Sequence, residues 1–304
     1  MKLVTYKQKG KPSSLRVGFI EGNKIVDLQE AYIEYKGNTV EAKQLLPSDP
    51  SAFYQIGHSV IERAKAAYSY VKENGMEGFF LDREEVYLST PNPTPQKIIC
   101  VGKNYAEHAA EMDSDIPDYP VLFAKYPNAL VGPDDNMVKS SFTQKMDYEV
   151  ELTVVIGKEA KDVPKENALD YIAGYTIGND GTARDLQKRT PQWLQGKNLD
   201  LSTPIGPWIV TADEVGDPGN LTIQSYVNGE MRQSSTTNKL IFDVPYLVEF
   251  ISQLMTLKPG DMIMTGTPDG VGFGMNPQQF LQNGDNVTLE IEKIGKMDNK
   301  VIEK

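Results

Sequence analysis

MDYEVELTVVIG at Met146–Gly157 and IAGYTIGNDGTARD at Ile172–Asp185 are the two segments around which this chain is organised. In the first segment, apolar residues alternate with Glu149 and Glu151, which is the pattern of a half-buried β-strand. Successive side chains of a strand point to opposite faces, so these two carboxylates project from the same face, one pleat apart. Close carboxylates repel each other, and burying them is unfavourable unless a cation, a proton or basic partners compensate.

The second segment adds a third acid, Asp180, directly after a strand-like run. No cysteine or histidine stands beside Glu149, Glu151 or Asp180, so the donors of this set are all oxygen. Such a set suits a hard divalent ion, Mg²⁺ or Mn²⁺, with water or substrate completing an octahedron. The alternative is a solvated face of an antiparallel sheet, because Glu-x-Glu on a strand is common without a metal.

Length and composition are those of an ordinary globular protein. The 304 residues are enough for one large domain or two modest ones with a real core. The net charge of −11 comes without any basic block, which argues against a nucleic-acid partner. No stretch approaches the roughly 20 apolar residues of a membrane helix. The N-terminus MKLVTYKQKGKPSS lacks the apolar segment of a signal peptide, so we expect a cytoplasmic protein without a membrane partner.

Cysteine and histidine are scarce. The single cysteine, Cys100, excludes an intrachain disulfide and lies in the apolar run KIICVG, so we expect a buried, inert thiol in a reducing compartment. The two histidines, His58 and His108, are too few for a His-rich zinc site. A Ser-His-Asp triad could use one of these two.

The N-terminal third predicts a small α+β unit. Short strand-like runs, KLVTYKQ, LRVGFIEG and KIVDLQEAY, are separated by turns at residues 10–13 and 22–23. Residues 50–75 have helical spacing and end at Gly75, and His58 is expected to pack on this helix. Three prolines within residues 91–97 mark an extended linker. We therefore expect an accessory domain over 1–90 and a second domain over 91–304.

A candidate acid–base pair follows the linker. His108 and Glu111 stand at i and i+3 of a predicted helix over 104–112, where such side chains are neighbours. A carboxylate beside an imidazole raises its basicity, as a general base acting on water requires. The alternative is an ordinary surface turn. The acidic, proline-containing stretch 113–119 comes next, and together they predict a mobile lid over 105–119.

Basic and amide side chains follow Asp180. Arg184 and Gln187 stand at i and i+3 of a predicted helix over 182–189, and Lys197 lies in the loop that follows. Near three carboxylates they are suited to an anionic substrate, or else they balance charge. The remaining chain predicts a hairpin turning at Asn228-Gly229, a helix over about 242–254, and a strand that ends in a Gly-rich loop without the P-loop signature.

Seven stretches in order resemble the fumarylacetoacetate hydrolase family, and the resemblance covers about residues 95–304. They are VGKNYAEHAAEM, PVLFAKYPNALVGP, MDYEVELTVVIG, AGYTIGNDGTARDLQ, WLQGKNLDLSTPIGPWIV, VNGEMRQSSTT and KPGDMIMTGTPDGVG. The first ninety residues resemble the small accessory domain of many bacterial members. The resemblance implies a strand-rich α+β fold, with a mixed β-sandwich or β-roll catalytic domain, and a homodimer.

The resemblance also implies roles for individual residues. The metal ligands for Mg²⁺ or Mn²⁺ would be Glu149, Glu151 and Asp180. The catalytic residues would be His108, Glu111 and Lys197, and the substrate-binding residues would be Arg184, Gln187 and Thr267.

The reaction is less constrained than the site, since one fold serves several reactions. We expect a small 2-oxo acid substrate and, first, metal-dependent hydrolysis of a C–C bond in an acylpyruvate or fumarylpyruvate-like 2,4-diketo acid, with water activated by His108. The alternatives are an oxaloacetate decarboxylase, a hydroxymuconate-type isomerase or decarboxylase of aromatic breakdown, and a non-enzymatic binding or regulatory protein.

Overall fold

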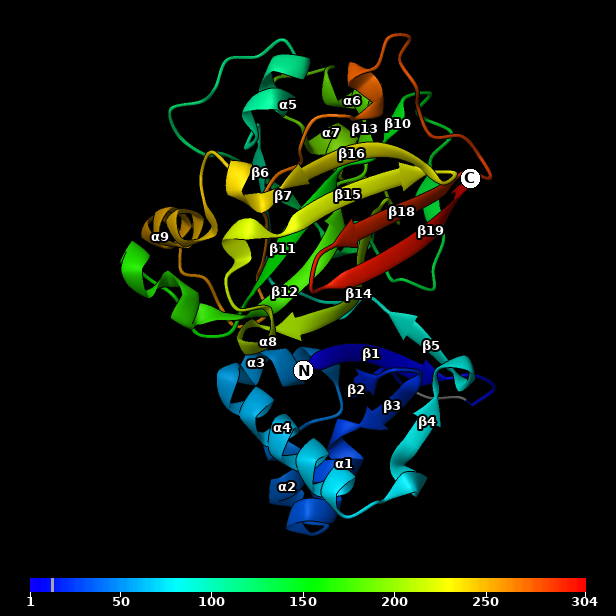
Figure 1. Ribbon diagram of the computed structural model, residues 1–304, viewed down its shortest axis with the longest axis vertical. Coiled ribbons are helices and arrows are strands. Elements are labelled where there is room, and N and C mark those ends of the chain that lie inside the picture. The colour runs from blue at the N-terminus through cyan, green and yellow to red at the C-terminus, as the bar shows by residue number, and fades with distance from the viewer. Residues whose placement is uncertain (12–13) are drawn as a thin grey trace.

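Strands form the centre of the molecule, and helices lie around and below them (Figure 1). The computed structural model describes residues 1–11 and 14–304. Within these ranges, one sheet of twelve strands runs through the middle and a second sheet has five strands. None of the described helices has the length and apolar character needed to cross a membrane. The predicted α+β, strand-rich fold class is confirmed.

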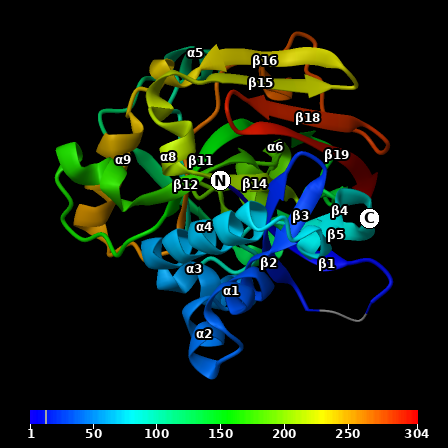
Figure 2. The ribbon, with the colours of Figure 1, turned by 60° about the horizontal axis from the view of Figure 1, so that its bottom comes forward.

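The N-terminal part forms the lower lobe in Figure 1. Its strands are β1 (Lys2–Gln8), β2 (Arg16–Glu21), β3 (Lys24–Asp27), β4 (Phe80–Asp82) and β5 (Val86–Ser89), and its helices are α1 (Leu28–Lys36), α2 (Val40–Leu45), α3 (Pro50–Ile56) and α4 (His58–Glu73). Figure 2 shows the four helices gathered beside these strands. Strand β1 also pairs with β14 (Thr203–Thr211), so one sheet joins this lobe to the upper part, and the division at residue 90 stays a prediction.

One predicted strand is partly a helix. The run KIVDLQEAY is β3 followed by α1, because the side chain of Asp27 accepts a hydrogen bond from the backbone N–H of Glu30 at 2.9 Å and caps the helix. The turn predicted at residues 10–13 falls partly on Pro12 and Ser13, which lie outside the described residues.

The helix predicted over 50–75 is two helices, α3 and α4, separated by Gly57. Gly57 has φ of 79°, and a Cβ there would lie 2.4 Å from the carbonyl oxygen of Gly157. Only glycine tolerates both conditions, so the chain turns here. His58 then starts the second helix, with its backbone N–H donating to Gly157 and its ring Nε2 3.0 Å from the oxygen of Ile172.

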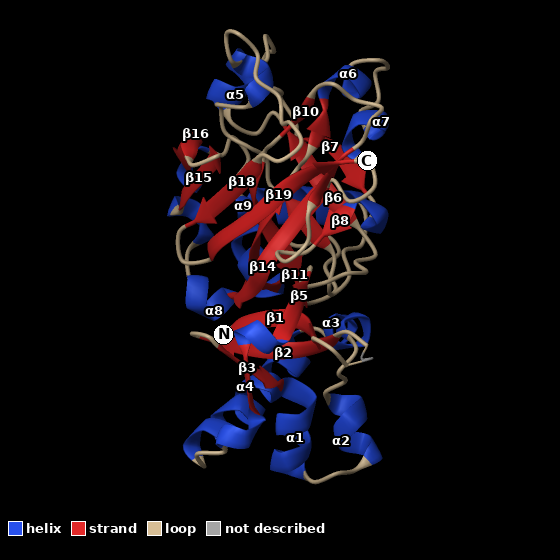
Figure 3. Ribbon diagram, turned by 90° about the vertical axis from the view of Figure 1, so that its right-hand side faces the viewer, coloured by secondary structure: helices blue, strands red, loops and turns tan. Residues whose placement is uncertain are grey.

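The upper part holds the remaining elements. Its other strands are β6 (Ile98–Gly102), β7 (Val121–Lys125), β8 (Leu130–Val131), β9 (Met137–Lys139), β10 (Met146–Asp147), β11 (Val150–Ile156), β12 (Ile172–Asn179), β13 (Thr182–Ala183), β15 (Thr222–Val227), β16 (Glu230–Thr236), β17 (Met262–Met264), β18 (Asn286–Ile291) and β19 (Gly295–Glu303). Its helices are α5 (Ala106–Glu111), α6 (Arg184–Gln187), α7 (Leu194–Lys197), α8 (Ala212–Val215) and α9 (Val244–Leu254). Figure 3 shows α5, α6 and α7 at the end of the molecule opposite α1–α4.

The acidic segment lies at the centre of the large sheet. The strand order is β4-β3-β2-β1-β14-β12-β11-β17-β6-β7, so β11 has strands on both sides. All seven residues of β11 are buried, and the half-buried strand predicted here is therefore wrong about its second face. The strand also starts later than predicted, at Val150. Met146 and Asp147 form the separate strand β10, which pairs with β13.

The main core lies between the central strands, the five-stranded sheet and α9. It joins residues of β11 and β12, such as Leu152 and Tyr175, to Leu289 of β18 and Val248 of α9. The predicted hairpin is confirmed: β15 and β16 meet at Asn228 and Gly229. The predicted helix after it is confirmed as α9.

Candidate metal centre and active site

Three buried carboxylates meet where β11 begins and β12 ends. Glu149 directly precedes β11, Glu151 is its second residue, and Asp180 directly follows β12. The antiparallel register opposes Val150 to Asn179, and the backbone N–H of Asp180 donates to the carbonyl of Glu149 at 2.9 Å. One oxygen from each carboxylate lies within 4.8 Å of the others. The pairing of the two strands therefore builds the predicted acidic cluster.

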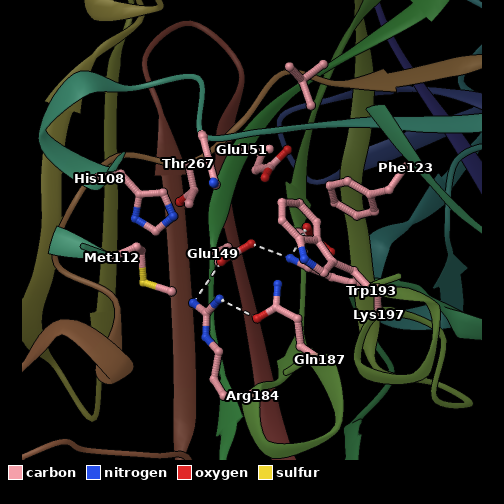
Figure 4. Close-up of a pocket in the computed structure, with 14 residues that line it drawn as sticks. His108, Met112, Phe123, Glu149, Glu151, Arg184, Gln187, Trp193, Lys197 and Thr267 are labelled. Carbon is pink, nitrogen blue, oxygen red and sulfur yellow. Dashed lines mark hydrogen bonds and ion pairs between the residues drawn. The ribbon is translucent and has the colours of Figure 1, made fainter. Parts of the chain in front are cut away.

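Three buried cations contact two of these carboxylates. Lys197 Nζ lies 2.8 Å from Glu149 Oε2 and 2.5 Å from Asp180 Oδ2. Lys125 Nζ lies 2.6 Å from Asp180 Oδ1, and Arg184 Nη2 lies 2.7 Å from Glu149 Oε1. Figure 4 shows Glu149 between Arg184 and Lys197. Burial opposes ionisation of Glu149, but Lys197 and Arg184 outweigh it and hold the pKa of that carboxyl below its ordinary value.

Glu151 is different. It accepts one hydrogen bond, from the backbone N–H of Gly266 at 2.9 Å, and no basic side chain in the described ranges forms an ion pair with it. Burial, together with the charges of Asp180 and Glu149, raises the pKa of Glu151 well above its ordinary value.

The residues present fit a divalent cation. The solvated-face alternative is wrong, because Glu149 and Glu151 are 4% and 2% exposed. A buried carboxylate without a cation partner is unfavourable, and a hard ion would supply the missing charge to oxygen donors. The set thus suits Mg²⁺ or Mn²⁺, as the sequence predicted.

The His–Glu pair lies beside the cluster. His108 on α5 is buried, and its Nδ1 lies 3.3 Å from Glu111 Oε2. Glu111 Oε1 accepts the backbone N–H of Gly270 at 2.9 Å, which fixes the carboxylate against the Gly-rich loop after β17. The surface-turn alternative does not fit this placement. The helix, Ala106–Glu111, is shorter than the predicted 104–112.

A small cavity of about 50 Å³ separates these groups. Eight of the nine predicted site residues line it: His108, Glu149, Glu151, Asp180, Arg184, Gln187, Lys197 and Thr267. The ninth, Glu111, does not line the cavity but contacts His108, which does. Figure 4 shows the His108 ring across the cavity from Trp193 and Lys197.

The segment carrying Arg184 and Gln187 differs from the prediction. The helix expected over 182–189 is the short α6, because residues 182–183 pair with β10 as β13. Asp180 is therefore placed by the end of β12 instead of a helix N-terminus. Arg184 and Gln187 still contact each other, with Nη1 donating to Oε1 at 3.3 Å.

Three further residues support the site, and their roles were not predicted. Lys125, at the end of β7, pairs with Asp180. Asp147 accepts from Arg184 Nε at 2.8 Å and from the backbone N–H groups of Gly272 and Phe273. Gln233 on β16 donates to Thr267 Oγ1 at 2.7 Å. Asp147 offered a signal, as an acid two positions before Glu149, whereas Gln233 offered none.

The remaining titratable candidates lie outside the cavity. Cys100 is fully buried, and burial raises the pKa of its thiol well above the ordinary value, so it is the inert core thiol that was expected. His58 packs against Ile172, as described above.

Comparisons with a family model and with curated proteins give consistent matches. Residues 97–302 match the family model described as fumarylacetoacetate (FAA) hydrolase C-terminal. An oxaloacetate tautomerase of Bacillus subtilis (strain 168) is 43% identical over 289 residues, covering 93% of this chain and 94% of that protein. A mitochondrial oxaloacetate tautomerase of Bos taurus is 41% identical over 269 residues, covering 88% and 84%.

Solved structures are similar over the whole chain. The fumarylacetoacetate hydrolase of the psychrophilic Exiguobacterium antarcticum has a TM-score of 0.77 and 37% identity, covering 100% of both chains. The maleylpyruvate hydrolase of Sphingobium sp. SYK-6, in complex with manganese (II) ion and pyruvate, has a TM-score of 0.76 and 28% identity, covering 100% of this chain and 99% of that one. The fold, the acidic cluster and these matches agree: the chain belongs to the fumarylacetoacetate hydrolase family.

Proposed function

We propose that this protein is a divalent-metal-dependent enzyme that interconverts the keto and enol forms of oxaloacetate. The observation that carries the proposal is the 41–43% identity to oxaloacetate tautomerases over most of both chains. It moves oxaloacetate ahead of the 2,4-diketo acids expected first from the sequence. It also favours tautomerisation over the decarboxylation expected as the alternative.

Glu149, Glu151 and Asp180 would hold Mg²⁺ or Mn²⁺, which when bound polarises the 2-oxo group of the substrate as a Lewis acid. Three other polar side chains of the cavity can bind the substrate. Arg184, Gln187 and Thr267 line it with hydrogen-bond donors for the carboxylate next to the oxo group.

The proton transfer needs one base and one group that stabilises negative charge. Tautomerisation breaks a C–H bond at C3 and forms an O–H bond at the C2 oxygen, with no water consumed. Nδ1 of His108 faces Glu111, which leaves Nε2 to take the C3 proton and return it to the C2 oxygen. Glu111, held by Gly270, orients the ring and stabilises its protonated form. Lys197 supplies N–H donors for the negative charge that develops on the C2 oxygen.

The size of the cavity supports a small substrate. Its volume of about 50 Å³ is below that of four other cavities in the described structure, which range from 210 to 480 Å³.

Hydrolysis of a C–C bond in an acylpyruvate or fumarylpyruvate-like acid is the second candidate. The His108–Glu111 pair favours it, because the same base could activate a water molecule, and the solved maleylpyruvate hydrolase shares the fold.

The test uses the Mg²⁺-loaded protein and three assays in parallel. We expect faster decay of enol-oxaloacetate, followed by its ultraviolet absorbance, without added release of CO₂ and without cleavage of acetylpyruvate. Release of CO₂ without acceleration of the enol decay would establish a decarboxylase instead, and cleavage of acetylpyruvate alone would establish the hydrolase.

A further inference from the structure

Among the described residues, one lysine that lines the cavity forms no ion pair with a carboxylate. Lys103, Arg184 and Lys197 are the lysine and arginine residues among those that line the cavity. The last two form ion pairs with the buried acids. In the described part of the chain, Lys103 forms no ion pair, and its ammonium donates to the hydroxyl of Ser114. A positive charge without a carboxylate partner therefore stands at the cavity.

The topology explains why Lys103 reaches the site. It directly follows β6, which is a parallel neighbour of β17, with Cys100 opposite Met264. Three residues further along this register, Lys103 and Thr267 come to the same carboxyl end of the strand pair. Both line the cavity. Ligands of α/β sheets gather at such strand ends because loops can present side chains there.

The backbone at Lys103 is held in an uncommon conformation. Its φ of 56° lies in the left-handed region, which residues with a side chain rarely adopt. The next residue, Asn104, fixes this turn, because its side-chain amide donates to the carbonyl of Thr265 at 2.7 Å and to that of Phe242 at 3.0 Å. Such strained positions gather at binding sites, where neighbouring contacts hold them.

The distal end of the substrate needs a cation of its own, and Lys103 can supply it. Lys125 is held by Asp180, whereas Arg184 and Lys197, besides their ion pairs with the buried acids, serve the 2-oxo acid end in the function proposed above, as a divalent ion would. The second carboxylate of a dicarboxylic acid needs its own cation, because a buried charge without a partner is unfavourable. We propose, building on the function proposed above, that Lys103 binds the distal carboxylate of the four-carbon substrate and selects 2-oxo dicarboxylic acids over 2-oxo monocarboxylic acids.

Ser114 connects this contact to the segment that carries the base. It lies three residues after α5, and an ammonium group has three N–H donors, so Lys103 can hold the Ser114 hydroxyl and a carboxylate together. A bound dicarboxylic acid would thereby contact Lys103, the residue after β6 that also holds the segment following α5.

Binding of two stable 2-hydroxy acids tests the proposal. Malate and 2-hydroxybutyrate share one end and differ in a terminal carboxylate against a methyl group. By calorimetry on the Mg²⁺-loaded protein, we expect malate to bind more tightly. Lys103→Met should lower the affinity for malate by about tenfold to 100-fold, the usual worth of a hydrogen bond between charged groups. The affinity for 2-hydroxybutyrate should stay within about threefold of that of the unaltered protein.

Three variants serve as controls. Lys103→Arg keeps the charge and should keep most of the preference for malate. Ser114→Ala removes the tie to the α5 segment and should keep the preference too. Lys296→Met changes an exposed lysine on β19 and should alter neither affinity.

The outcomes separate this inference from the proposed function. Equal weakening of both acids in Lys103→Met, or no preference for malate in the unaltered protein, would overturn the role of Lys103, even in an active tautomerase. A preference for malate that Lys103→Met abolishes would support it, even if oxaloacetate tautomerisation were not accelerated.

Discussion

Replacing Glu151 by glutamine should stabilise the protein in the absence of metal and destabilise it relative to the unaltered protein in the presence of metal. Glu151 is 2% exposed, and one of its two carboxylate oxygens has a hydrogen-bond donor, the N–H of Gly266. Glutamine keeps an oxygen acceptor for that N–H and removes the charge that Asp180 and Glu149 oppose. We expect a gain of about 1–3 kcal/mol, the usual cost of a buried polar group without full partners.

Metal should reverse this order. At a free Mn²⁺ concentration of about 1,000 times Kd, the unaltered protein gains about 4.1 kcal/mol, which exceeds the advantage of the variant, and the variant gains little because it has lost a ligand. Differential scanning calorimetry with EDTA or Mn²⁺ measures both states. In EDTA the variant should melt higher, by about 2–4 °C per kcal/mol, and in Mn²⁺ it should melt lower.

Glu149→Gln is the matched control. Glu149 forms ion pairs with Lys197 and Arg184, so the same change removes the partner of two buried cations. It should cost about 3–5 kcal/mol even in EDTA. If Glu151→Gln also lowered the melting temperature in EDTA, Glu151 would be satisfied within the protein, and the argument that it needs a metal ion would be refuted.

Further predictions concern pH, the base, Arg184 and the lid. The pKa of Glu151 is raised in the folded protein above its ordinary value of 4.5, so the unfolded state binds fewer protons between these two pKa values and the unaltered protein loses stability as pH rises. In EDTA the stability advantage of Glu151→Gln should therefore vanish near pH 4 and grow as pH rises. A stability advantage independent of pH would contradict this. His108→Ala should lower kcat by about 10²- to 10⁴-fold and leave oxalate affinity within about tenfold, as expected of a base that does not hold the ligand; a matching loss of oxalate affinity would make His108 a binding residue. Asp147→Asn should raise KM more than it lowers kcat, because it loosens Arg184 without touching the base; steady-state kinetics at several Mg²⁺ concentrations would show it, with an unchanged KM as the contrary result. Hydrogen exchange across 105–119 should slow when oxalate binds the Mg²⁺-loaded protein, whereas equal protection in both states would mean that the segment is a fixed wall.

The sequence predicted the side chains of the site better than it predicted their partners. Alternation along Met146–Gly157 placed Glu149 and Glu151 together, since a strand pattern reports positions two residues apart. Lys125 and Asp180 are 55 residues apart, and Asp147 and Arg184 are 37 apart. The second contact follows from the pairing of β10 with β13, and the first joins the ends of β7 and β12, which are not neighbours in the sheet. Local periodicity encodes neither arrangement.

Secondary-structure errors have the same kind of cause. The predicted helix over 50–75 looked continuous because its apolar spacing continues across Gly57. The break follows from the close approach of Gly157, which belongs to another part of the chain. The short α6 likewise reflects the pairing of β13 with β10, a tertiary contact that overrides the helical propensity of residues 182–189.

Proton exchange at C3 of oxaloacetate tests the central claim most directly. In D₂O with Mg²⁺, followed by proton NMR, the protein should replace C3 hydrogen of oxaloacetate by deuterium faster than the uncatalysed exchange, with no matching formation of pyruvate. EDTA or His108→Ala should return the rate towards that background. Exchange no faster than background in the Mg²⁺-loaded protein, or exchange that keeps its full rate in EDTA, would contradict a metal-dependent proton transfer by His108.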